Sequence, residues 1–315
     1  MTALTHEFSE TLAAPREAVF RALTDETELT RWFAEHVQVE PEAGGEFRFW
    51  GMHTYGAPTR AQSSQKIVRV EAPVLLVFSW HLEGRDSEVT LELAPDPDAA
   101  PGTSTILKGR HHFPQAPDVP RALDLIDDLW RNACANLRAH LTGGEGVCRP
   151  DFSDPRPRLR QVIMINAPRE DVFKALLEPA ILDKWIAAQA TVEPQVEGRY
   201  SYGWKYQVRG KQVEGGPTQI LELVEDTKLV TDWPNWRGEA EPPAQRVTWL
   251  LEGIGDQTRL ILIHEPFERI TDLSDYPQGW QQFLGKLKAQ VESTTDARVA
   301  QAAPTPLYDA EGGGI

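Results

Sequence analysis

APREAVFRAL, at residues 14–23, returns as APREDVFKAL at residues 167–176, which is 153 positions later in the chain. The same offset pairs Trp80 with Trp233, and no gap is needed between the two points. Solenoid proteins repeat much shorter units, of roughly 20–50 residues. The sequence therefore predicts a duplicated domain, in a chain of 315 residues whose length suits two ordinary globular domains.

Gly, Pro and charged residues gather between the two copies and again at the end of the chain. We expect the first copy to span residues 5–142 and the second to span residues 159–294. Residues 143–158 are predicted to be a linker. Residues 296–315, which close with three glycines and an isoleucine, are predicted to form a disordered tail.

Both copies show the same order of hydrophobic patterns. A short alternating segment comes first, and Pro15 or Pro168 then stands where a helix can begin, because a first-turn proline gives up an amide that would lack a partner. Asp25 and Pro179 mark a second short helix. Alternating segments separated by Gly, Pro and Asp follow, as is typical of antiparallel strands joined by hairpins. Each copy closes with a long amphipathic helix.

These patterns predict an α+β protein of two tandem domains, each an antiparallel curved sheet wrapped around a long C-terminal helix. A terminal helix of about 30 Å is long enough to cover one face of such a sheet. A concave sheet and a straight helix are not complementary along their full length. We therefore expect a cavity between the sheet and the helix of each copy.

Composition excludes several classes of partner and chemistry. The net charge of −15 argues against nucleic acid and anionic membranes, which bind clustered Lys and Arg. Cys134 and Cys148 fit no zinc spacing, and we see neither a signal peptide nor a membrane span. We expect a cytoplasmic protein without cofactor or metal. The missing GxGxxG, P-loop, HExxH and GxSxG motifs argue against nucleotide enzymes, zinc proteases and α/β-hydrolases.

Several short motifs carry a resemblance to a known family. They are the repeated opening motif, the tryptophans Trp32 and Trp185, Val39-Glu40-Pro41 with Gly45, Leu76-Val77 with Trp80, His264-Glu265-Pro266-Phe267, and Gly279-Trp280. Together these motifs resemble the SRPBCC superfamily, also called START-like or birch-pollen-allergen-like. Within it, the chain is most similar to domains like the C-terminal domain of the activator of the heat-shock protein 90 ATPase.

The resemblance covers about residues 5–142 and 157–294. It implies a helix-grip fold around a hydrophobic cavity, and members bind lipids, polyketides or hormones, act as cyclases, or serve as co-chaperones. The first copy departs from the pattern, with His111-His112-Phe113 at the end of its last strand and Asp128-Leu129 before Trp130.

His111 and His264 occupy matching positions near the end of the last predicted strand. Period-two counting puts His111 on the face of Leu107 and Gly109, and it puts His264 on the apolar face of the second copy, so both are predicted to point inward. One interpretation is a hydrogen-bond donor or general base toward a ligand. The other, which we favour, is a half-buried histidine bonded to a backbone carbonyl.

Aromatic side chains with a polar atom suit a mostly apolar pocket that orients its ligand. Trp80 and Trp233 recur in both copies, which also indicates a role in core packing. The sequence leaves open whether Trp204 and Tyr206 face the cavity or the outside, and whether the turn up to Trp236 is a lid or a longer hairpin. The candidate cavity residues are Trp50, Trp80, His111, Trp204, Tyr206, Trp233, Trp249 and His264.

Three functions follow as hypotheses. The leading one is a non-enzymatic protein that binds a small hydrophobic or amphipathic ligand between sheet and long helix, with the second copy as the main binder because it holds more pocket-type aromatic residues. The alternative is a co-chaperone that activates a heat-shock protein ATPase, which rests on the family resemblance alone. The third is a cyclase- or hydrolase-like enzyme in which His264 or His111 acts as the base. We assign no catalytic residue and no metal ligand.

Overall fold

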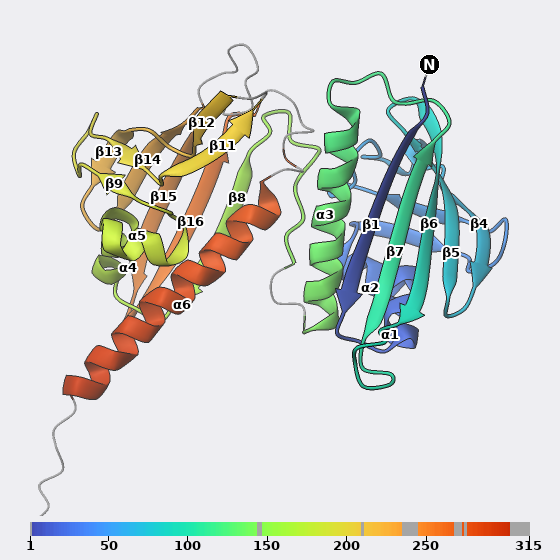
Figure 1. Cartoon of the computed structure of the whole chain (residues 1–315), viewed down its shortest axis with the longest axis horizontal. Coiled ribbons are helices and arrows are strands. Elements are labelled where there is room, and N and C mark those ends of the chain that lie inside the picture. Colours follow the sequence, from blue (N-terminus) through green and yellow to red (C-terminus); the bar gives the residue numbers. More distant parts are fainter. Residues whose placement is uncertain are drawn as a thin grey trace, which may run out of the picture. The chain divides into compact units, whose positions relative to one another are not determined.

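Each copy of the repeat folds into a five-stranded sheet and a long helix (Figure 1). The computed structural model describes residues 2–143, 147–208, 211–234, 245–267, 273 and 276–302, and the chain divides into two compact units. The predicted α+β class with two tandem helix-grip domains is confirmed. The predicted domain boundaries remain predictions.

The first sheet has the strand order β1-β7-β6-β5-β4, and all of its neighbouring strands are antiparallel. A separate pair of short strands, β2 and β3, lies between β1 and β4 in the chain. The strands are β1 (Leu4–Leu12), β2 (His36–Val39), β3 (Phe47–Trp50), β4 (Lys66–Glu71), β5 (Leu75–Leu82), β6 (Arg85–Pro95) and β7 (Thr105–Phe113), and the helices are α1 (Arg16–Thr24), α2 (Glu26–Trp32), the 3₁₀ turn η1 (Arg60–Gln62) and α3 (Ala122–Leu141).

Alternation along β7 fixes which face of the first sheet is inside. Every second residue of β7 is buried, including His111, as the period-two pattern predicts. Gly109 leaves room for the ring of Phe8 on the neighbouring strand, since a Cβ at Gly109 would lie 2.0 Å from that ring. Phe8 in turn stacks on Trp130 of α3, with 4.8 Å between ring centroids. The long helix is therefore held against the inner face of the sheet.

In both copies, a tryptophan side chain hydrogen-bonds the second short helix to the first. The Asp25 carboxylate accepts a hydrogen bond of 2.9 Å from the Glu28 amide and caps α2, as predicted. The Trp32 indole then donates to the Ala22 carbonyl at 3.0 Å, which ties α2 back to α1. Trp185 makes the same bond to Ala175, also at 3.0 Å. The recurring tryptophans thus serve the packing of these helices.

The second copy has a sheet ordered β13-β14-β15-β16-β8, and it differs from the first copy by an added hairpin, β11–β12, where the first copy has η1. Its strands are β8 (Leu159–Ile165), β9 (Thr191–Val192), β10 (Tyr200–Ser201), β11 (Trp204–Val208), β12 (Lys211–Gly215), β13 (Ile220–Val224), β14 (Lys228–Trp233), β15 (Gln245–Ile254) and β16 (Gln257–Glu265), and its helices are α4 (Arg169–Leu177), α5 (Pro179–Trp185) and α6 (Pro277–Ala302). Helix α6 continues through residues 296–302, where the sequence indicated a disordered tail. Residues 303–315, and the turn containing Trp236, lie outside the described residues.

Part of the predicted linker is built onto the first copy. We call residues 147–153 the strap. The Asn136 side chain of α3 holds it through two hydrogen bonds: Oδ1 accepts from the Cys148 amide at 2.8 Å, and Nδ2 donates to the Cys148 carbonyl at 2.9 Å. The Phe152 amide donates to the Met52 carbonyl at 2.7 Å. Val147 and Phe152 also pack against the hydrophobic core. Two apolar side chains in a Gly- and Pro-rich stretch explain why the strap docks.

Candidate functional site

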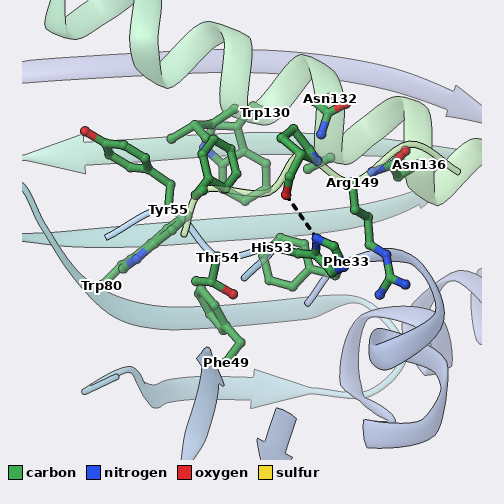
Figure 2. Close-up of a pocket in the computed structure, with 14 residues that line it drawn as sticks. Phe33, Phe49, His53, Thr54, Tyr55, Trp80, Trp130, Asn132, Asn136 and Arg149 are labelled. Carbon is green, nitrogen blue, oxygen red and sulfur yellow. Dashed lines mark hydrogen bonds between the residues drawn. The ribbon is translucent and has the colours of Figure 1, made fainter. Parts of the chain in front are cut away.

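A partly enclosed cavity of about 50 Å³ lies in the first copy, between α3, the sheet and the strap (Figure 2). Strands β3 and β5, the end of α2, the loop after β3, helix α3 and the strap all contribute to its walls. Its lining residues are Phe33, Phe49, His53, Thr54, Tyr55, Trp80, Leu129, Trp130, Asn132, Ala133, Asn136, Arg149, Pro150 and Phe152. The expected position between sheet and long helix is therefore where this cavity is found.

Aromatic rings meeting edge to face make the core of the cavity wall. Trp80 lies nearly perpendicular to Phe49, at 5.2 Å between centroids, and to Trp130, at 6.2 Å. Phe33, at the end of α2, meets Phe49 in the same way at 4.9 Å. Edge-to-face pairs are a favoured arrangement because the positive edge of one ring faces the negative face of the other. The wall thus presents both ring faces and ring edges.

The loop after β3 supplies one polar side of the cavity. Gly51 has a φ of +110°, which lets the chain leave the strand, and its amide and carbonyl bond to Ala57 and Thr54 across the loop. The Tyr55 hydroxyl donates to the Glu83 carboxylate. Burial, together with this carboxylate, raises the pKa of Tyr55 well above its ordinary value, so the phenol stays neutral.

The strap closes the cavity on the remaining side. His53 Nδ1 donates to the Pro150 carbonyl at 3.0 Å, the bond drawn in Figure 2. Arg149 donates to the backbone carbonyls of Thr30 and Ala34 at 2.8 and 3.3 Å, at the C-terminal end of α2. A cation is favourable at this end of a helix. Burial lowers the pKa of Arg149, and nearby Glu35 opposes that effect.

Two polar atoms of the cavity wall are buried without a hydrogen-bond partner. They are Oγ1 of Thr54, a residue only 6% exposed, and Oδ1 of Asn132 on α3. Buried polar atoms in native proteins are nearly always paired, because an unpaired one loses its bonds to water and gains nothing in return. The lining of this cavity therefore contains two polar atoms whose capacity for hydrogen bonds is unused among the described residues.

His111 lies behind the cavity wall, stacked on Trp80 at 5.3 Å, and is not among the lining residues. Its Nδ1 accepts a hydrogen bond of 3.1 Å from the Trp130 indole, which can only donate. The Ser87 hydroxyl gives its proton to the Trp80 carbonyl at 2.6 Å, so His111 Nε2 must donate to Ser87 at 2.8 Å. Burial, with a smaller effect of His6, lowers the pKa of His111 to about 3. Both ring nitrogens are engaged in a neutral ring, which favours a structural role, but the ring is completely buried and bonds to two side chains instead of the backbone carbonyl that the sequence suggested.

His264 repeats part of this arrangement in the second copy. It is fully buried, and its Nδ1 accepts from the Trp280 indole at 3.1 Å. Burial lowers its pKa to about 3 as well. Tyr276 and Phe267 pack on the ring, at 4.5 and 5.0 Å between centroids.

The other sequence candidates have different surroundings. Trp50 points away from the cavity and stacks on His36 at 5.4 Å. Trp249 is completely buried against Trp185. Tyr206 is 36% exposed, while Trp233 is buried in β14. Of the eight candidates, Trp80 is the one that lines the cavity of the first copy.

Trp204 occupies the place in the second copy that corresponds to the cavity of the first. Its ring packs on Tyr202 and Trp233, which the 153-residue offset matches to the cavity residues Phe49 and Trp80. Its indole donates to the carbonyl of Ile186, the counterpart of Phe33, at 2.8 Å.

On the helix side, Trp204 stacks on Phe283 at 5.5 Å. When Trp130 and Trp280 are aligned, Phe283 corresponds to Ala133, another lining residue of the first cavity. A large ring thus stands in the second copy where the first copy has only a methyl group. Trp204 and Phe283 together fill the space that the first copy leaves open.

The sequence analysis missed the polar residues of the first cavity. Thr54, Asn132, Asn136 and the strap residue Arg149 belong to a loop, a helix and a segment read as a linker. The one available signal was the strap itself, whose Val147 and Phe152 are apolar side chains in an otherwise polar stretch. Apolar side chains of this size are not expected in a linker that stays in solvent.

A wider, open depression of about 780 Å³ lies among α1, α2 and the end of α3. Three of its charged or titratable side chains are paired, because Glu28 bonds to His140 at 2.6 Å and to Arg31 at 3.5 Å. Within the described ranges, no group of three or more His, Cys, Asp or Glu is arranged to hold a metal ion. Among the helices that the structure describes, none has the length and apolarity that crossing a bilayer requires. The cavity beneath the strap has a more apolar lining than this depression.

Three solved structures illustrate what this chain is similar to. CalU16 from Micromonospora echinospora is 27% identical over 45% of this chain and 76% of its own, with a TM-score of 0.36. DynU16, described as a putative protein in the dynemicin biosynthetic locus, is 15% identical over 91% of this chain and 98% of its own, with a TM-score of 0.37. The Aha1 dimer from Colwellia psychrerythraea is 19% identical over 43% of this chain and 96% of its own, with a TM-score of 0.35.

Among curated proteins, no significant match to the chain is found. A sequence model of one family, described as Activator of Hsp90 ATPase homolog 1-like protein, matches residues 13–141 and again residues 166–292. The two matches coincide with the two copies and cover most of the chain. The chain therefore belongs to the family of Activator of Hsp90 ATPase homolog 1-like proteins and carries that domain twice in tandem.

Proposed function

We propose that the first copy binds a small apolar or amphipathic ligand in the cavity beneath the strap. The observation that carries this proposal is the partly enclosed space of about 50 Å³ between α3 and the sheet, with many aromatic rings in its wall. Protein interiors are close-packed and keep few voids larger than a water molecule. Small-molecule sites are mostly apolar and hold a few polar groups that orient the ligand. The wall of this cavity has that composition.

The first copy is a better candidate than the second copy, which the sequence favoured. Trp204 and Phe283 fill the corresponding space in the second copy, and they stack on each other. In the first copy the matching helix position is Ala133, and the space is open. The aromatic residues that suggested a pocket in the second copy are better explained as side chains that occupy the space between its sheet and its long helix.

Binding an organic molecule requires the cavity to grow. An engineered cavity that holds benzene measures about 150 Å³, three times the volume here. The sheet and α3 belong to the packed core, whereas the strap is held by a few hydrogen bonds and the Phe152 ring. Segments with few buried contacts open at lower free energy than the core. We therefore expect the strap to move when the ligand enters.

The test is native mass spectrometry of the protein purified gently from its own host. We expect a reproducible extra mass with a stoichiometry of one ligand per chain. Ala133→Phe copies the second copy's filling into the first and should abolish the extra mass. Leu123→Phe is the matched control, because Leu123 lies on the same helix but is 50% exposed. Thermal unfolding of both variants checks that overpacking has not unfolded the domain.

The outcomes separate the alternatives. An extra mass that survives in Ala133→Phe would place the ligand elsewhere and contradict the proposal. A clean mass for the wild type, together with stimulation of the host chaperone's ATPase, would favour the co-chaperone alternative. The enzyme alternative with His111 as base is disfavoured, since the neutral ring already uses both nitrogens in hydrogen bonds.

A further inference from the structure

We propose that this cavity selects an uncharged, planar aromatic compound that carries hydroxyl groups, an inference that rests on the binding function proposed above. The observations behind it are the two unpartnered polar atoms, the use of the charged lining residue in another interaction, and the geometry of the aromatic walls.

The hydrogen-bonding requirement comes from opposite sides of the cavity. Asn132 belongs to α3, and Thr54 belongs to the loop after β3 (Figure 2). The Asn132 Oδ1 atom can only accept, so its partner must donate a proton. The Thr54 hydroxyl can donate or accept. A hydroxyl group satisfies both atoms, and a guest with one hydroxyl toward each side satisfies them together.

The absence of charge follows from how the one permanently charged lining residue is used. Arg149 donates to the carbonyls of Thr30 and Ala34 and so completes the end of α2. Glu35 lies close enough to Arg149 to offset part of its positive charge, so an anionic guest would gain little from that guanidinium. No carboxylate is among the lining residues, so a cationic guest would be desolvated without a counter-charge. A neutral guest avoids both costs.

The aromatic preference follows from ring geometry. Phe49 and Trp80 stand at 83° to each other, and Trp80 and Trp130 stand at 86°. A flat ring that stacks on one of these walls meets the edge of the next, so it gains at both contacts. A flat guest also needs the strap to move less than a flexible acyl chain of the same mass would. Shape and electrostatics therefore agree.

The experiment compares naphthalene, 2-naphthol and 2,6-naphthalenediol by calorimetric titration of the full-length protein. We expect the affinity to rise roughly tenfold for each hydroxyl added, since each one pairs a buried polar atom. Asn132→Leu and Thr54→Val should each remove about one of these steps, so the roughly hundredfold preference for the diol over naphthalene should fall to about tenfold in either variant. Gln282→Leu is the matched control, because it makes a similar change at the corresponding position of α6, where Gln282 is exposed.

Several results would overturn the inference while leaving the proposed function intact. Naphthalene binding as tightly as the diol is one, and tighter binding of 2-naphthoate or decanoate is another. A third is that none of these compounds binds although a host-derived mass sensitive to Ala133→Phe is found. If no compound binds and no such mass exists, the proposed function itself fails. Thermal unfolding of Asn132→Leu and Thr54→Val confirms that each variant is folded before it is titrated.

Discussion

The indole Nε1 of Trp130 lies 3.1 Å from Nδ1 of His111 and donates a hydrogen bond to it, and Trp280 and His264 repeat the pair at the same distance in the second copy. The bond joins the long helix to the last strand of the sheet in each copy. In the first copy it fixes the ring tautomer, because Nε2 must then donate to Ser87. The recurring tryptophan and histidine thus form one structural unit that links helix and sheet.

Replacing Trp130 with Phe should destabilise the first copy through this bond. The substitution keeps an aromatic ring but leaves the buried Nδ1 of His111 without a donor, which costs about 1–3 kcal/mol in addition to any packing change. Urea denaturation measures the loss in unfolding free energy. Trp50→Phe is the control, since Trp50 is only partly buried and stacks on His36 at the outside. Equal effects of the two substitutions would contradict a special role for the Trp130 bond.

The two buried histidines should make stability depend on pH. Burial lowers the pKa of both to about 3, while in the unfolded chain they titrate near 6.5. Between pH 6.5 and pH 3 each histidine binds a proton in the unfolded state but not in the folded state. The free energy of unfolding is therefore highest above pH 6.5, and it decreases as the pH falls from 6.5 toward 3. The expected loss is about 1.4 kcal/mol per pH unit for each histidine.

Unfolding free energies at pH 7 and pH 5 test this effect. His111→Gln should reduce the dependence of the unfolding free energy on pH by the contribution of one histidine. This holds whatever the substitution does to the stability at pH 7. Nitrogen-15 spectra of the wild type should still show a neutral His111 ring, with the proton on Nε2, at pH 5. A charged ring at that pH, or an unchanged slope in the variant, would be incompatible with the prediction.

Removing the Trp204 side chain should open a cavity in the second copy. Trp204→Ala leaves a space between Trp233 and Phe283, and because Trp204 is only partly buried the cost should stay below about 3 kcal/mol. Titration with naphthalene should then reveal one more binding equivalent than in the wild type. Tyr206→Ala, two residues along the same strand and exposed, should leave the stoichiometry unchanged. A wild-type protein that already binds two equivalents would show that the space is not filled.

Asn136 should control how often the strap opens. Asn136→Leu removes both hydrogen bonds to Cys148, so the strap should open more often while the fold persists. Hydrogen exchange at the amides of Cys148 and Phe152 should quicken roughly tenfold or more. Asn132→Leu, one turn earlier on α3, is the control and should leave both rates unchanged. Unaltered exchange in Asn136→Leu would mean that the strap is held by its other contacts.

Local patterns were sufficient for most of the architecture. The starts of the short helices, the alternation along β7 and the apolar face of α3 are all set by residues near one another in sequence, and the repeat supplied a second reading of each. The candidate site was less accessible. Trp204 has the composition of a pocket residue, yet it packs on Phe283, nearly 80 positions away in the chain.

By itself, the sequence determined that the chain holds two copies of one α+β domain, in which His111 and His264 face inward. Periodicity and turn residues act over a few positions, so they can be read from one chain. Only the tertiary structure decided that the first copy keeps a cavity, that Trp204 fills the second, and that residues 147–153 cover the first. The reason is that the volume of a cavity is a small difference between two large volumes. One is the space between elements that are distant in sequence, and the other is the volume of the side chains that occupy this space. A single Ala133 in place of a ring changes that difference, while the hydrophobic pattern stays the same.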